Sequence, residues 1–105
     1  NFIDLIRVKF YDGLSFTKLI PDYLIQSGDH IGNGTGFPGY FIPSECKENG
    51  FDNQLVFEEG IVCMARGAKF NTEGSQFFVL LTKDRYIEGD YTAFGKVIEG
   101  SALII

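Results

Sequence analysis

Short apolar stretches along this chain alternate with segments rich in glycine, proline and polar residues. Phe2, Leu5 and Ile6 recur at helical spacing, so residues 1–10 are expected to form the end of a helix that Tyr11-Asp12-Gly13 terminates. The remaining pattern predicts five short strands, at residues 14–20, 23–27, 60–65, 74–81 and 92–98. Turn signals separate most of them, which indicates a mainly β fold.

The first two strands are expected to pair as an antiparallel hairpin, because only Pro21-Asp22 separates them. That pairing brings Lys18 and Gln26 within reach of each other on neighbouring strands. Taken alone, a lysine or a glutamine in a strand is usually a solvated edge residue. The hairpin therefore identifies a candidate pair without assigning it a role.

The strand at 74–81 carries an amide and an aromatic ring on one face, since side chains alternate along a strand. Gln76, Phe78 and Leu80 share that face. Such a face suits a site that holds an apolar ring and also hydrogen-bonds a peptide group. An ordinary buried strand gives the same pattern. The strand at 60–65 is almost wholly apolar, which is typical of a central strand buried on both faces.

With 105 residues the chain has room for one domain, residues 1–105. Antiparallel strands joined by turns indicate an all-β barrel or sandwich with minor helix. The polar stretch at 45–59 is expected to be irregular, residues 82–90 to form a loop, and a helix to begin near Glu99.

Charge and composition exclude several classes of function. A net charge of −5, with no run of basic residues, argues against a nucleic-acid partner. No apolar stretch reaches the roughly 18 residues that span a bilayer, so no membrane partner is expected. No signal peptide is visible and a cytoplasmic location is expected, although the chain begins at Asn1 and its true start can lie upstream.

No cofactor or metal is expected. Cys46 and Cys63 fit neither a zinc motif nor a Cys-x-x-Cys redox pair. Free thiols are the simplest reading, and a disulfide between them stays open. Residues 34–39 spell G-x-G-x-x-G, but Pro38 and Pro43 prevent the helix that a dinucleotide site requires. Residues 73–77 do not match a nucleophile elbow, so hydrolase chemistry has no support.

Five ordered blocks of sequence resemble one known family. They are Phe16-Thr17-Lys18-Leu19-Ile20-Pro21 with Tyr23-Leu24-Ile25-Gln26-Ser27-Gly28-Asp29, Gly34-Thr35-Gly36-Phe37-Pro38-Gly39-Tyr40, Met64-Ala65-Arg66-Gly67-Ala68, Gly74-Ser75-Gln76-Phe77-Phe78 and Tyr91-Thr92-Ala93-Phe94-Gly95-Lys96-Val97-Ile98-Glu99-Gly100. In this order and at these spacings they resemble the cyclophilin family of peptidyl-prolyl cis-trans isomerases, and bacterial-type members most closely. The resemblance covers nearly the whole chain.

The resemblance implies a closed eight-stranded antiparallel barrel with a helix at each end. Domains of that family are longer than this chain. By comparison, the strands before the first helix, most of the second helix and the closing strand are missing. The chain is therefore expected to be a partial cyclophilin-like domain, with sheet edges exposed where a barrel would close.

The resemblance also implies a site, position by position. The family's catalytic arginine falls on Lys18 and the glutamine that orients it on Gln26. The expected binding residues for a proline-containing peptide are Tyr23, Leu24, Ala65, Arg66, Gln76, Phe78, Tyr86, Ile87 and Tyr91. Tyr86 stands where many members have tryptophan, so any binding of ciclosporin is expected to be weak.

Three functions stay open. The leading expectation is prolyl isomerisation in unfolded or flexible polypeptides. Activity is expected to be reduced because a lysine lacks the planar fork of an arginine at position 18. The alternatives are a module that binds proline-containing peptides without catalysis, and an inactive domain fragment.

Overall fold

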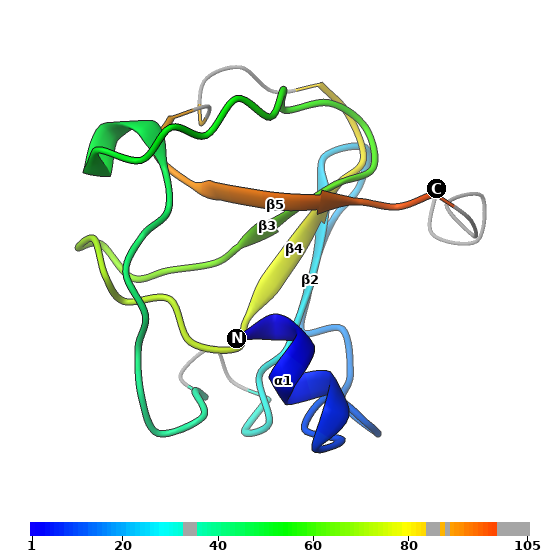
Figure 1. Ribbon diagram of the computed structural model, residues 1–105. Helices are drawn as coiled ribbons and strands as arrows, with labels where there is room; N and C mark the ends of the chain where they lie inside the picture. Colours follow the sequence, from blue (N-terminus) through cyan, green and yellow to red (C-terminus); the bar gives the residue numbers. More distant parts are fainter. Residues whose placement is uncertain (33–35, 84–86, 88, 99–105) are drawn as a thin grey trace.

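The computed structural model describes residues 1–32, 36–83, 87 and 89–98, and these form one antiparallel sheet with one short α-helix (Figure 1). The elements are α1 (Phe2–Arg7), β1 (Lys18–Ile20), β2 (Leu24–Ser27), the 3-10 helix η1 (Lys47–Asn49), β3 (Ile61–Met64), β4 (Phe77–Leu80) and β5 (Thr92–Lys96). The strands lie in the order β1-β2-β4-β3-β5, and every neighbouring pair is antiparallel. The expected mainly β fold is confirmed. Within the described residues the sheet stays open, with β1 and β5 at its edges.

The expected antiparallel hairpin of β1 and β2 forms, and its register places Lys18 directly opposite Gln26. The strand at β1 is shorter than the predicted 14–20, and its three residues are all exposed because it is an edge strand. The ladder continues one step further, since the Thr17 amide donates to the Gln26 carbonyl at 3.0 Å. Hairpin geometry thus fixes the position of two candidate site residues.

Helix α1 ends at Arg7, earlier than the sequence pattern predicts. Lys9 adopts a left-handed conformation with φ of 63°. Its amide donates to the Ile6 carbonyl at 3.0 Å, and the Phe10 amide donates to the Leu5 carbonyl at 2.9 Å. These two bonds form a Schellman motif, which usually requires glycine at the left-handed position. Because a lysine occupies it here, the end of the helix could not be predicted from the residue types.

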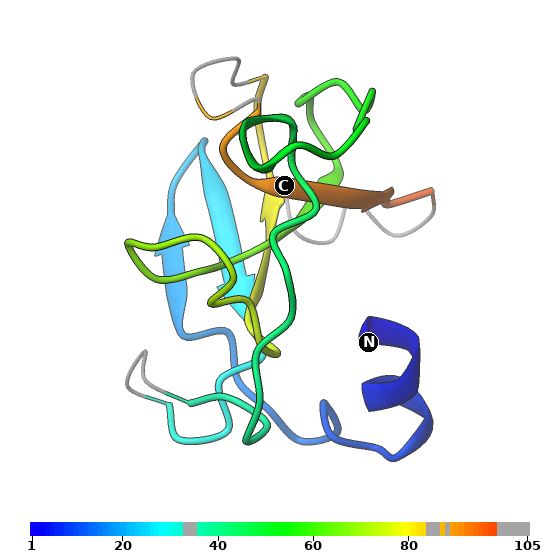
Figure 2. The same ribbon diagram turned by 60° about the vertical axis from the view of Figure 1, so that its left-hand side comes forward.

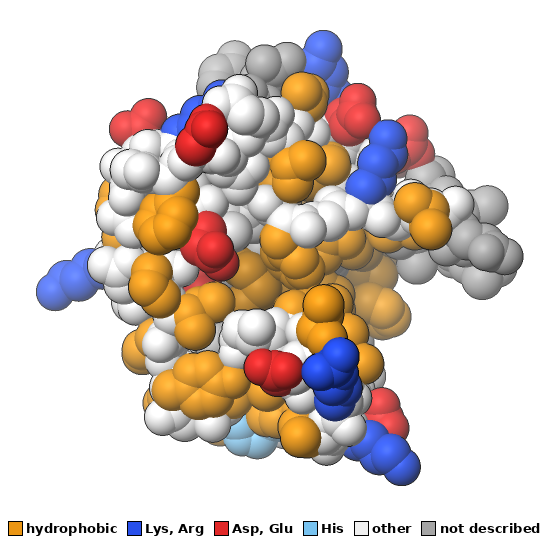
Figure 3. Space-filling model, in the orientation of Figure 1, with side chains coloured by type: hydrophobic (Ala, Val, Ile, Leu, Met, Phe, Trp, Pro, Cys, Tyr) orange, Lys and Arg blue, Asp and Glu red, His pale blue; other side chains and the backbone are white. Residues whose placement is uncertain are grey.

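One face of the sheet packs against α1 (Figures 1 and 2). The ring of Phe2 lies 5.3 Å from that of Phe77 in β4 and 4.9 Å from that of Phe94 in β5. The space-filling view shows a hollow lined by hydrophobic side chains between α1 and the strand above it (Figure 3). A cavity of about 200 Å³ there is lined by Phe2, Met64 and Phe94, among others. This face is only partly covered.

The opposite face carries the hydrophobic core. Its buried residues are Leu24, Phe57, Ile61, Cys63, Phe78, Leu80 and Ala93. Phe57 belongs to the stretch at 45–59, which is irregular as expected apart from η1. Asn53 fastens this stretch to the sheet by donating to the Ala93 carbonyl at 2.9 Å. A segment that looks polar in sequence therefore supplies a core aromatic ring that sequence analysis missed.

Cys46 and Cys63 are free and buried. Burial raises the pKa of the Cys63 thiol to about 12, because the thiolate loses its hydration. The expected free thiols are thus confirmed. No helix in the described part of the chain is long and apolar enough to cross a bilayer. The helix expected near Glu99 lies outside the described residues.

Candidate functional site

A pocket with an aromatic and aliphatic wall and three polar side chains at its edge opens on the core face, where β1, β2 and β4 meet the segments after β3 and before β5. Its volume is about 290 Å³. The lining residues are Lys18, Ile20, Tyr23, Leu24, Gln26, Ala65, Arg66, Phe78, Ile87 and Tyr91. All of these except Ile20 were predicted from the sequence as site residues. The structure therefore brings these candidates together, while their roles stay predictions. Tyr86 lies outside the described residues.

Aromatic rings form the wall of this pocket. Phe78 lies on the same side of β4 as Leu80 and is almost wholly buried. Tyr91 meets it edge to face, with ring centroids 5.7 Å apart and an interplanar angle of 81°. The remaining apolar lining comes from Tyr23, Leu24 and Ile87. The pocket is suited to hold a small apolar ring.

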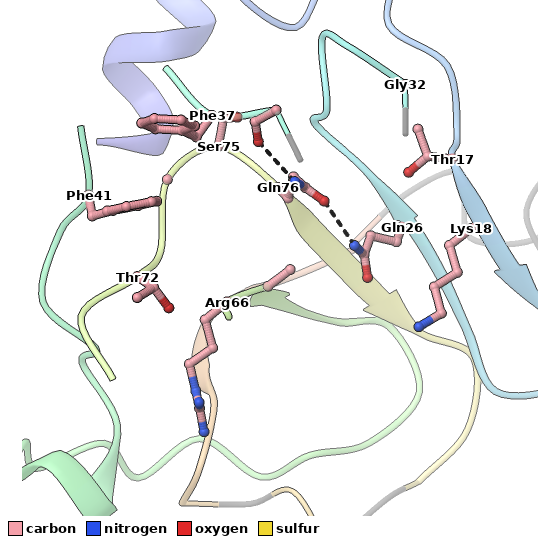
Figure 4. A pocket seen from close by; sticks show the side chains of 13 residues that line it. Thr17, Lys18, Gln26, Gly32, Phe37, Phe41, Arg66, Thr72, Ser75 and Gln76 are labelled. Atoms are coloured by element: carbon pink, nitrogen blue, oxygen red, sulfur yellow. Dashed lines mark hydrogen bonds between the residues drawn. The ribbon is translucent and has the colours of Figure 1, made fainter. Parts of the chain in front are cut away.

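A larger cavity of about 600 Å³ adjoins the pocket and shares Lys18, Gln26, Ala65 and Arg66 with it. We call the two together the groove. The larger cavity also contains Gln76, the one described candidate that does not line the pocket (Figure 4). Its other lining residues include Thr17, Phe37, Phe41 and Thr72, which sequence analysis did not nominate. Phe37 and Phe41 stack with ring centroids 4.8 Å apart, and two aromatic residues in a glycine-rich loop were the available signal.

Two glutamines form a chain of hydrogen bonds across the groove (Figure 4). Gln76 donates from Nε2 to the Gly36 carbonyl at 2.9 Å. Gln26 in turn donates from Nε2 to Gln76 Oε1 at 3.2 Å. This direction leaves Gln26 Oε1 without a donor among the described residues. An acceptor is therefore held beside position 18.

Lys18 supplies a cation next to that acceptor. It faces Gln26 across the hairpin and lines both parts of the groove. Within the described residues its ammonium makes neither a hydrogen bond nor an ion pair. The charge expected at this position is present, but neighbouring side chains do not fix it in place.

Arg66, by contrast, is held firmly. Its guanidinium lies between the rings of Phe70 and Tyr91, 4.7 Å from each centroid. Its Nε donates to the Asp90 carbonyl at 3.0 Å, and its Nη1 donates to the Gly67 carbonyl at 3.0 Å. Cation–π contacts of this kind contribute about 0.5–1 kcal/mol at exposed sites. The resemblance implied only peptide contacts at this position, whereas the side chain also braces the pocket wall at Tyr91.

The loop after β2 is packed closely against the start of β4, and Gly28 makes this possible. Its φ is +97°, and a Cβ at this position would lie 2.3 Å from the Ser75 carbonyl oxygen. Ser75 Oγ donates to the Gly28 carbonyl at 2.7 Å. Glycine is thus required both by conformation and by space. The contact sets the position of Gln76, the next residue.

A buried carboxylate supports the segment that leads into β4. Glu73 is fully buried and accepts from Ser44 Oγ at 2.6 Å, from the Thr72 amide at 3.1 Å and from Thr92 Oγ1 at 3.3 Å. Such bonds offset the cost of burying a charged group. Glu73 therefore ties the groove wall to β5, a role that sequence analysis did not foresee.

The arrangement suits the binding of an apolar ring and of a peptide group. No cluster of three or more histidine, cysteine or acidic side chains that could hold a metal occurs among the described residues. The groove offers an apolar pocket, two cations and a line of amides. These groups can hold a ring, bind a peptide group and stabilise a developing lone pair.

Comparison with known proteins identifies the family. Residues 1–104 match the model of the family described as "Cyclophilin type peptidyl-prolyl cis-trans isomerase/CLD". Peptidyl-prolyl cis-trans isomerase B of Bacillus subtilis is 42% identical over 100 residues, covering 95% of this chain and 66% of the relative. A peptidyl-prolyl cis-trans isomerase of Synechococcus elongatus is 38% identical over 103 residues, covering 98% of this chain and 66% of the relative. The chain thus spans slightly less than two thirds of these relatives.

A solved structure agrees with these matches. The crystal structure of a Cryptosporidium parvum cyclophilin type peptidyl-prolyl cis-trans isomerase, in the presence of the dipeptide Ala-Pro, superposes with a TM-score of 0.87 at 33% identity. The similarity covers 99% of this chain and 66% of that chain. Family model, relatives and fold agree, and the chain belongs to the cyclophilin-type peptidyl-prolyl cis-trans isomerase family.

Proposed function

We propose that this chain catalyses cis-trans isomerisation of X-Pro peptide bonds in unfolded or flexible polypeptides. The observation that carries the proposal is the ring-sized apolar pocket of Phe78, Tyr91 and Leu24, with Lys18 and Gln26 at its edge. The names of its relatives support it, as does the related protein crystallised in the presence of Ala-Pro.

The chemistry requires no nucleophile. Rotation about a peptide bond costs about 18–20 kcal/mol, because resonance delocalises the nitrogen lone pair. In the twisted bond this pair is localised on the proline nitrogen. Lys18 would donate a hydrogen bond to it while the apolar pocket holds the proline ring, and Gln76 would bind the peptide backbone. Interactions made only with the twisted bond lower the barrier.

Two-dimensional exchange NMR on a short Ala-Pro peptide tests the proposal. A catalytic amount of protein is expected to accelerate cis-trans exchange, and Lys18→Ala is expected to abolish the acceleration. Leu19→Ala provides a matched control, because Leu19 is exposed on the adjacent position of β1 and does not line the groove. Unchanged exchange with a folded protein would overturn the proposal.

One observation favours a second candidate, a module that binds proline-containing peptides without catalysis. Lys18 replaces the family arginine, and the described residues do not hold its ammonium in place. A fixed cation is what a preorganised catalyst requires. Peptide-induced chemical-shift changes without faster exchange would identify this function.

We also propose that ciclosporin binds weakly. Tyr86, which lies outside the described residues, replaces a tryptophan found in many members of the family. A tyrosine ring offers less apolar area than an indole ring. Titration of the protein with ciclosporin, compared with Tyr86→Trp, checks this point, and the tryptophan variant is expected to bind more tightly.

A further inference from the structure

The charge of the groove is opposite to that of the whole chain. The chain has 14 acidic and nine basic residues, with a net charge of −5. Among the described residues that line the groove, Lys18 and Arg66 are cations and none is aspartate or glutamate. A local positive field in an acidic protein attracts anionic groups, and a concave surface focuses that field.

Both cations can receive an anionic partner. Arg66 uses Nε and Nη1 for bonds to backbone carbonyls, and Nη2 meets no acceptor within the described part of the chain. The rings of Phe70 and Tyr91 hold the guanidinium plane, so little side-chain freedom is lost when it binds a carboxylate. The Lys18 ammonium is likewise unpaired among the described residues. Figure 4 shows the two side chains on opposite sides of the cavity, with Gln26 and Gln76 between them.

The location of these cations limits where a ligand's charge can lie. Lys18 and Arg66 line both the apolar pocket and the larger cavity. A peptide with its proline in the pocket places neighbouring residues in the larger cavity, since an extended chain advances about 3.3 Å per residue. Side chains one or two residues from the proline therefore come close to the cations.

We infer that the groove selects proline-containing peptides with an acidic side chain within two residues of the proline, because Lys18 and Arg66 line it and its described lining residues include no aspartate or glutamate. The inference rests on the proposed function for its rate readout. It names a substrate class within that function, and Arg66 as the residue that determines the preference.

The expected preference is moderate. Exposed ion pairs change an equilibrium by a small factor, so one carboxylate is expected to raise kcat/KM about threefold over the isosteric amide. Salt is expected to reduce the ratio towards one, since the Debye length falls from about 30 Å at 0.01 M to about 3 Å at 1 M. A lysine in place of the acid is expected to lower kcat/KM below that of the amide.

The test uses short peptides that carry glutamate, glutamine or lysine one or two residues before or after a single proline. Both the exchange rate and the binding affinity are measured by NMR, at low and at high salt. The readout is the glutamate-to-glutamine ratio within each protein, which does not depend on its absolute activity. Arg66→Gln is expected to lower the ratio, and Lys9→Gln, an equal charge change outside the groove, to leave it unchanged.

The outcomes separate the inference from the proposed function. Faster exchange of every peptide with equal ratios would overturn the inference and leave the isomerase function standing. No acceleration of any peptide would remove the isomerase function, and the binding affinities would then decide the preference. A ratio that persists at about 1 M salt or in Arg66→Gln would also overturn the inference, because screening and charge removal must both reduce it.

Discussion

Replacing Lys18 with arginine is expected to raise the isomerase activity of this chain. Gln26 donates to Gln76, so its Oε1 has no donor among the described residues, and Lys18 lies directly opposite Gln26. Directly opposite residues of an antiparallel pair have Cβ atoms about 4.5–5.5 Å apart, within reach of a long side chain. A guanidinium could donate to Gln26 Oε1 and still direct further N–H groups into the groove, whereas an ammonium is not held in one orientation.

The size of the gain follows from one added bond. A hydrogen bond to a charged group is worth about 1.5–3 kcal/mol, and the exposure of Lys18 places it at the lower end. About 1.4 kcal/mol corresponds to a tenfold increase in kcat/KM. Exchange NMR on an Ala-Pro peptide measures it, with Leu19→Arg as the control that adds an arginine beside the site. If kcat/KM of Lys18→Arg stays within about twofold of that of the parent, the reasoning is refuted. The direction of the hydrogen bonds between Gln26 and Gln76 would then have no influence on catalysis.

Three further changes test the support of the groove. Gly28→Ala is expected to cost about 2 kcal/mol more stability than Gly13→Ala in urea unfolding, because both have positive φ but only Gly28 would clash with Ser75; equal losses would contradict the clash. Glu73→Ala is expected to lower the free energy of unfolding by about 3 kcal/mol in thermal unfolding, because it leaves the buried donors of Ser44 and Thr72 without an acceptor. Glu73→Gln should cost less. Cys63, with a pKa raised to about 12 by burial, should resist thiol reagents until unfolded. An unfolded thiol ionises near pH 9, so this residue's contribution to stability is complete below that pH and falls as pH rises towards 12. If the urea midpoint of Cys63→Ala falls as much as that of the parent protein when the pH rises from about 9 towards 12, this assignment is contradicted.

The approximate strand positions and the pairing of β1 with β2 could be predicted from sequence, because they depend on local signals. Pro21-Asp22 between two apolar runs gave the hairpin, and the alternation at 74–81 placed Gln76 and Phe78 on one face, where both now line the groove. The lengths of the strands could not be predicted, because an edge strand is paired only along the part that its neighbouring strand accompanies. Phe57 was missed for a similar reason: it follows Leu55 and Val56 in a short apolar run, and only long-range packing decides that Phe57 is buried while those two side chains are exposed.

The candidate site was nominated through family resemblance, and the residues gave much less by themselves. A lysine, a glutamine and an aromatic residue in strands carry no chemistry that a sequence pattern alone reveals. The chain of amides from Gly36 to Gln26 joins residues from three separate segments. The two rings that enclose Arg66 likewise come from different loops. Contacts of this kind exist only after the chain has folded.

The open sheet bears on the third function that the sequence left open, an inactive fragment. The groove lies on the core face, where β1, β2 and β4 carry it and Phe57 closes the packing beneath. The partly covered face lies on the other side of the sheet, where β3, β4 and β5 face α1. Side chains alternate between the two faces along a strand. A segment that covers one face of the sheet therefore contributes no side chains to the groove on the other face. The groove can therefore be fully formed while the opposite face is exposed, and incomplete covering would lower the stability of this fold before it altered the geometry of the site.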